Sequence, residues 1–200
     1  MINIGLILLA YVLGMIPNIY ILRPFFTHDK LDYVRSDEVG TYKVFVNFKK
    51  PEFFMVVALD FLKGFLLVLL TMFIDTWSFL PMLLILVAVI ARNFNLFIGF
   101  RNGLGIAIMM GGLALYAPWI LLIYAVLVII IQLFINDLDS ALAMSTIVIP
   151  VGSAFLIEAI HSILLGIFLV AVVFIHKIIY TQAAAFRTRH RDFTRENPFA

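Results

Sequence analysis

The chain has 200 residues, of which 64% are hydrophobic and only 13% are charged. Soluble domains are about half apolar and about a quarter charged, so a soluble chain of this size would have too little polar surface to cover its core. The net charge of +2 does not fit the clustered basic face of a nucleic-acid-binding protein, and the absence of cysteine excludes disulfides and thiolate metal sites. The composition predicts an integral membrane protein.

Charge-free intervals locate the membrane spans, because a spanning helix needs about 20 predominantly apolar residues. The first span is predicted over residues 1–22, which lack the cationic segment and cleavage site of a signal peptide. The second covers residues 53–74 and the third covers residues 76–91.

Residues 102–136 carry no charge but are too long for one helix. We expect Gly111-Gly112 and Ala117-Pro118-Trp119 to break this stretch into the fourth and fifth spans, because proline fits the first turn of a new helix and tryptophan favours the membrane interface. The sixth and seventh spans are predicted over residues 140–157 and 159–176.

The positive-inside rule orients this bundle of seven helices. Every Lys and Arg except Lys63 lies in three segments on one side: the loop of about residues 23–52, the turn of about residues 92–105 and the tail of about residues 177–200. We therefore expect a single all-α transmembrane domain over residues 1–200, with its N-terminus outside and its C-terminus in the cytoplasm.

Asp60 and Lys63 are ionisable residues inside a predicted span. They lie three residues apart on one helical face, so they can neutralise each other. Ionisable groups within a span often mark a functional site, whereas a buried pair can also serve helix packing alone. We favour the second interpretation and expect a structural intramembrane pair.

Gly103 and Gly105 lie in a turn that leads into the predicted fourth span. Free backbone N–H groups at the positive end of a helix dipole form an anion site, to which Arg101 would add a guanidinium. A tight interfacial turn, with Arg101 extended to lipid headgroups, explains the pattern equally well.

His190 stands between Arg189 and Arg191, just beyond the predicted seventh span. Its imidazole titrates near neutrality and could act as a base or bind phosphate. Composition alone favours a basic patch on anionic lipid instead. His161 and His176 have no partner at metal-ligand spacing, and we interpret both as interfacial.

These segments, in this order, resemble the PlsY family, the bacterial acyl-phosphate:glycerol-3-phosphate acyltransferases. Gly14-Met15-Ile16-Pro17 is similar to the family's Gly-Ser-Ile-Pro, and residues 35–46 align without gaps with its first loop motif. Asp60, Lys63 and Gly64 match its Asp-x-x-Lys-Gly, and residues 91–107 follow the spacing of its glycine-rich motif. Ser140 and Arg189-His190 stand at its third motif and its tail motif.

The sequence departs from the family pattern at several polar positions. Glu38 replaces an Asn, Val46 an Arg, Arg92 a His and Leu104 a Lys. This sequence matches the family motifs better at positions that support the scaffold than at positions that bind phosphate.

The resemblance implies a membrane acyltransferase that moves an acyl group from acyl phosphate to the sn-1 hydroxyl of glycerol 3-phosphate. The product is lysophosphatidate, an intermediate of phospholipid synthesis. Ser36 and His190 are the implied catalytic residues. The implied phosphate ligands are Lys43, Arg92, Arg101, Gly103 and Gly105.

The implied partners are acyl phosphate, glycerol 3-phosphate or a similar polyol phosphate, and membrane lipid, with no nucleic acid, metal or cofactor. The implied location is the plasma membrane, with the active side facing the cytoplasm. Two alternatives remain: a non-catalytic relative that binds lipid, acyl phosphate or a partner protein, and a small transporter that uses Asp60 and Lys63 as a relay.

Overall fold

The computed structural model describes residues 2–22, 50–74, 76–95, 104–157 and 160–196. All regular elements in these ranges are helices, as predicted. They are α1 (Ile2–Met15), α2 (Asn18–Leu22), α5 (Lys50–Met72), α6 (Leu80–Asn93), α7 (Ile106–Tyr116), α8 (Pro118–Ile135), α9 (Leu138–Ser145), α10 (Val148–Gly152), the π-helix η4 (Ser153–Ile157) and α11 (Ile160–Glu196).

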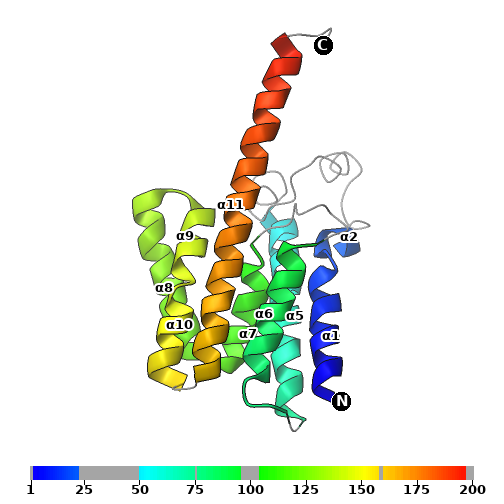
Figure 1. Cartoon of the computed structure of the whole chain (residues 1–200), viewed down its shortest axis with the longest axis vertical. Coiled ribbons are helices and arrows are strands. Elements are labelled where there is room, and N and C mark those ends of the chain that lie inside the picture. The colour runs from blue at the N-terminus through cyan, green and yellow to red at the C-terminus, as the bar shows by residue number, and fades with distance from the viewer. Residues whose placement is uncertain (1, 23–49, 75, 96–103, 158–159, 197–200) are drawn as a thin grey trace.

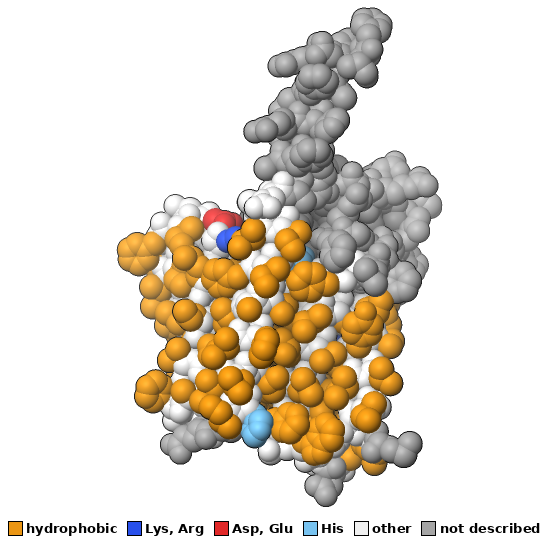
Figure 2. Space-filling model, viewed as in Figure 1, with side chains coloured by type: hydrophobic (Ala, Val, Ile, Leu, Met, Phe, Trp, Pro, Cys, Tyr) orange, Lys and Arg blue, Asp and Glu red, His pale blue; other side chains and the backbone are white. Residues whose placement is uncertain are grey.

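The helices stand side by side and run alternately up and down (Figure 1). α1 begins at the lower end in that view, and α11 passes well beyond the upper end. Hydrophobic side chains cover most of the face seen in Figure 2, and charged side chains gather at its upper edge. This surface is the one that a lipid solvent requires.

Within the described ranges, four helical segments are long and apolar enough to cross a bilayer. They are Phe54–Met72, Pro118–Ile135, Leu138–Phe155 and Ile160–Ile179. Three shorter apolar helices, α1, α6 and α7, accompany them. The chain is therefore an all-helical membrane protein.

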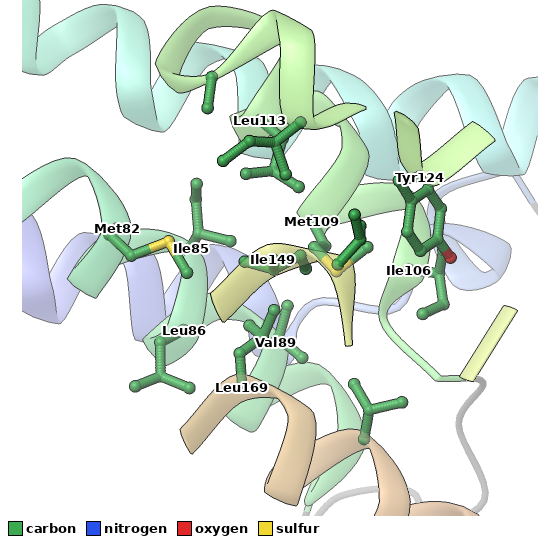
Figure 3. Packing of buried hydrophobic residues seen from close by; sticks show 14 of the residues in the cluster. Met82, Ile85, Leu86, Val89, Ile106, Met109, Leu113, Tyr124, Ile149 and Leu169 are labelled. Carbon is green, nitrogen blue, oxygen red and sulfur yellow. The ribbon is translucent and has the colours of Figure 1, made fainter. Parts of the chain in front are cut away.

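The core lies where α6, α7, α8, α10 and α11 meet. Figure 3 shows side chains from these helices converging, among them Ile85, Met109, Ile149 and Leu169, each at most 1% exposed. Tyr124 is also fully buried, and its hydroxyl donates a hydrogen bond to the Leu142 carbonyl at 3.1 Å. The polar end of the ring is thus satisfied inside an apolar core.

Glycines let α5 and α7 pack backbone against backbone. A Cβ on Gly64 would lie 1.9 Å from the Ile108 carbonyl oxygen, and one on Gly111 would lie 1.9 Å from the Phe61 carbonyl oxygen. Small residues of this kind dominate helix interfaces in membranes, where close packing replaces the hydrophobic driving force.

The predicted break at Gly111-Gly112 is therefore wrong. α7 continues through both glycines, because the space that a side chain would fill is occupied by a neighbouring helix: Gly111 faces Phe61 on α5, and Gly112 faces Ile85 on α6. The break predicted at Ala117-Pro118-Trp119 is confirmed, with Pro118 in the first turn of α8.

Two other predicted spans are continuous in sequence but interrupted in structure. The first is divided at Ile16 and Pro17 into α1 and α2. The sixth is built from α9, α10 and η4, and Asp137 caps the start of α9 by accepting a hydrogen bond from the Ser140 backbone N–H at 3.2 Å. Irregular backbone is tolerated in a membrane bundle only where protein surrounds it.

Candidate functional site

A buried polar network joins three helices at the upper end of the bundle. The Asp60 carboxylate on α5 accepts hydrogen bonds from the Asn18 side-chain amide at 2.7 Å and from the Arg92 guanidinium at 3.0 Å. Asp60 and Arg92 are each 6% exposed, and Asn18 is fully buried. The carboxylate is neutralised, and each of its oxygens has a partner, which is what makes a buried charge tolerable.

This arrangement corrects the expected pair of Asp60 and Lys63. Asp60 forms its ion pair with Arg92, and the Lys63 ammonium donates to the Ile16 backbone carbonyl at 2.6 Å. A guanidinium presents a planar fork of donors, so it satisfies a buried carboxylate better than an ammonium does. The prediction that Asp60 serves helix packing fits this geometry, but its partner comes from α6.

The same residues hold the break between α1 and α2. The helix end leaves backbone carbonyls without N–H donors in their own helix. Lys63 binds the carbonyl of Ile16, and the Asn95 side-chain amide binds that of Met15. Gly14 allows close approach here, since a Cβ on it would lie 2.5 Å from the Ala88 carbonyl oxygen.

The turn from α6 to α7 places a helix N-terminus beside this network. Gly105 caps α7 with a left-handed φ of 66°, a conformation that glycine adopts without strain. No side chain caps this helix start, so the N–H groups of its first turn are available to an anion. Of the predicted phosphate ligands in this segment, Gly105 lies at the turn, whereas Arg92 is directed to Asp60.

His176, predicted to be interfacial, is a buried residue of this end of the bundle. It is 2% exposed and packs edge-on against Phe94, with ring centroids 6.0 Å apart. Phe94 directly follows α6, so His176 lies near the α6–α7 turn.

His190 lies farther along α11, the helix that extends past the bundle in Figure 1. At 1.5 Å per residue it is about 21 Å beyond His176. The sequence predicts a catalytic role for His190 and an interfacial position for His176. His176 ends the apolar run of the predicted seventh span, and Lys177 follows it directly.

An apolar groove opens between the ends of α8, α9 and α11. Its volume is about 550 Å³, within the range of small-molecule sites. Ile135, Met144, Phe174 and Ile178 supply apolar walls.

A polar cluster of Asp137, Ser140 and Lys177 borders this groove. The Lys177 ammonium donates to the Ser140 hydroxyl and lies 3.9 Å from the Asp137 carboxylate. The groove thus combines an apolar body with a rim that carries an ammonium, a hydroxyl and the Asp137 carboxylate.

Four predicted site residues, Ser36, Lys43, Arg101 and Gly103, lie outside the described residues. Within the described ranges, no group of three His, Asp or Glu side chains is placed to hold a metal ion.

The chain matches the model of one protein family, described as glycerol-3-phosphate acyltransferase, over residues 4–186. The glycerol-3-phosphate acyltransferase of Streptococcus gordonii is 34% identical over 191 residues, covering 94% of this chain and 86% of that protein. The same enzyme of Streptococcus sanguinis is 32% identical over 190 residues, covering 94% and 85%.

Solved structures show the same fold. The crystal structure of PlsY, an integral membrane glycerol 3-phosphate acyltransferase, in its glycerol 3-phosphate form matches with a TM-score of 0.76. It is 23% identical and covers 94% of each chain. The lysophosphatidic acid form matches with the same TM-score, at 22% identity.

Proposed function

The chain belongs to the glycerol-3-phosphate acyltransferase family, and we propose that it acylates the sn-1 hydroxyl of glycerol 3-phosphate to give lysophosphatidate for phospholipid synthesis. We further propose that acyl phosphate is the donor. The observation that carries the donor proposal is the groove beside α11, where apolar walls end at Lys177 and Ser140. Acyl phosphate has the matching chemistry, with a hydrocarbon chain and a phosphate head.

The reaction does not require a covalent intermediate between the acyl group and the protein. The glycerol hydroxyl oxygen attacks the acyl carbonyl carbon and forms the ester C–O bond. The C–O bond to phosphate breaks, and its electron pair leaves with inorganic phosphate. Because phosphate is a good leaving group, the protein contributes by positioning the two substrates and stabilising developing charge.

We propose that His176, in place of His190, accepts or orients the proton of the attacking hydroxyl. Its position beside Phe94 supports this assignment, because the α6–α7 turn offers an anion site nearby. For the residues outside the described ranges, the family motif supports Ser36 as a catalytic residue and Lys43, Arg101 and Gly103 as phosphate ligands.

Arg92 has a different role in this proposal from the one its sequence position implies. Its guanidinium neutralises Asp60 and fixes the end of α6, so we assign it as a positioning residue. Gly105 remains a phosphate-binding position, since its backbone starts α7.

The proposed topology has seven spans in the plasma membrane, with the N-terminus outside and the active side in the cytoplasm. It is supported by the four long and three short apolar helices and by the Lys and Arg residues at one end. One domain over residues 1–200 would then contain the whole site.

The test mixes purified protein with acyl phosphate and glycerol 3-phosphate and follows phosphate release and lysophosphatidate formation. Ser36→Ala and His176→Gln should abolish most turnover, and His190→Gln should leave it near the parent rate. If the parent shows no turnover but acyl phosphate raises its melting temperature, the chain is a binding-only relative. If neither is seen, the family activity has been lost.

A further inference from the structure

Asn93 is a buried amide with no hydrogen-bond partner among the described residues. It ends α6 and is fully buried, and neither its Oδ1 nor its Nδ2 is paired. A buried polar group without a partner loses its hydrogen bonds to water and forms none in the protein, which destabilises the folded state. Such groups are rare in native proteins, and binding of an absent ligand is one explanation for them.

The Asn93 amide lies against Gly105, the residue that caps α7. A Cβ on Gly105 would be 2.9 Å from Asn93 Oδ1, so the amide occupies the space directly beside the helix cap. α7 has eleven residues, and its first intrahelical bond there runs from the Met109 N–H to the Gly105 carbonyl at 3.2 Å. The N–H groups of the three residues before Met109 therefore have no acceptor within the helix.

The surroundings of this turn favour a site that binds an anion through uncharged N–H donors. Leu104 precedes Gly105 and is buried and apolar, and the Arg92 guanidinium is directed to Asp60. Gly105 and Ala107 are both partly exposed, so a ligand can approach the helix start from that side. Backbone N–H groups and one amide N–H are donors, and an acceptor-only group such as a phosphate matches them.

We propose that Asn93 is a phosphate-binding residue, whose amide Nδ2 donates to a substrate phosphate held at the N-terminus of α7. This inference rests on the proposed function, since both substrates of that reaction carry phosphate. Asn93 would then select for a phosphate group by hydrogen bonding, without adding charge. The amide is therefore unpaired in the free protein and gains its hydrogen-bond partner when the ligand binds.

The alternative is that Asn93 only fills space at the end of α6. The two roles respond differently to Asn93→Leu, which keeps the branch at Cγ, is somewhat larger and removes the polar atoms. A space-filling role predicts unchanged substrate affinity. A binding role predicts weaker binding of phosphate.

The experiment measures KM for glycerol 3-phosphate and for acyl phosphate with the full chain in lipid nanodiscs. Asn93→Leu should raise the KM of one substrate by about tenfold or more, the loss expected for one hydrogen bond to a charged group. The substrate affected identifies which phosphate the site holds. Asn93→Asp, which keeps the shape but repels an anion, should raise the same KM further.

A second readout does not depend on turnover. Inorganic phosphate should raise the melting temperature of the parent protein and should have less effect on both variants. Unchanged KM values in Asn93→Leu, or equal stabilisation of parent and variant by phosphate, would overturn the proposal. If the parent has no acyltransferase activity, the proposed function fails, and the phosphate stabilisation still decides the role of Asn93.

Discussion

Two polar clusters at the same end of the bundle differ in what their charges are available to do. Asn18, Asp60 and Arg92 form a closed cluster, in which each charged residue is 6% exposed and the carboxylate is saturated. Asp137, Ser140 and Lys177 form an open cluster beside the groove, where the Lys177 side chain is 24% exposed and that of Asp137 is 54% exposed. The first cluster joins three helices through buried groups, whereas the second leaves its polar groups partly exposed beside the groove.

The difference follows from solvation. In the closed cluster a lost partner leaves an uncompensated charge in a low-dielectric interior, so the network resists change. In the open cluster water can replace a lost partner, so the same ion types contribute little to stability. Variants of the closed cluster should therefore mainly lower stability, and variants of the open cluster should mainly change substrate binding.

The largest effect is expected when the closed cluster is broken. Arg92→Ala should lower the free energy of unfolding by about 3–5 kcal/mol, because Asp60 is left buried without its cation. Thermal unfolding in one detergent would measure this. The double variant Asp60→Asn with Arg92→Met should recover part of the loss. If Arg92→Ala is as stable as the parent but binds phosphate more weakly, Arg92 is a phosphate ligand, as its sequence position implies.

The next effect concerns His176, which directly precedes Lys177 on α11 and packs against Phe94. Replacing a general acid or base typically lowers the rate by about 10²- to 10⁴-fold. His176→Gln should therefore reduce kcat by about 10²-fold or more, measured as phosphate release at saturating substrate. His190→Gln is the matched control on the same helix. Similar rates for parent and His176→Gln would remove this histidine from the reaction.

A third prediction tests the packing beneath the closed cluster. Gly64→Ala puts a methyl group where the Ile108 carbonyl oxygen lies 1.9 Å away, so α5 and α7 must separate. Overpacking of this kind costs about 1–3 kcal/mol. Gly5→Ala is the control, since nothing lies within 4 Å of that position. If the two variants melt at the same temperature, α5 and α7 do not pack as closely as described.

The contrast also shows what a single sequence can predict. The helices were predictable because bilayer thickness sets a local length requirement that charge-free intervals report. The break before Pro118 was predictable for the same local reason. The partner of Asp60 was not, because the choice between Lys63 and Arg92 depends on where α6 lies in space.

Tertiary packing also decided the features that were predicted wrongly. Gly111 and Gly112 have the composition of a turn, but neighbouring helices use their missing side chains. His176 was predicted to be interfacial, but it is buried and packs against Phe94. The site roles of Ser36, Lys43, Arg101, Gly103 and His190 stay predictions.

The smallest stability effect is expected in the open cluster. Lys177→Met should change the free energy of unfolding by less than about 1 kcal/mol, because exposed ion pairs contribute little. If the groove holds the acyl phosphate donor, the same variant should raise the KM for that donor by about tenfold, through loss of one charge-assisted contact. The KM for glycerol 3-phosphate should change much less.

Thr181→Val is the matched control for this last variant. Thr181 also lines the groove, but its hydroxyl donates to the Lys177 backbone carbonyl at 2.9 Å and carries no charge. A donor KM that rises equally in both variants would indicate a general disturbance of the groove. A rise confined to Lys177→Met would assign the anionic head of the donor to the open cluster, because the apolar walls are the same in both proteins.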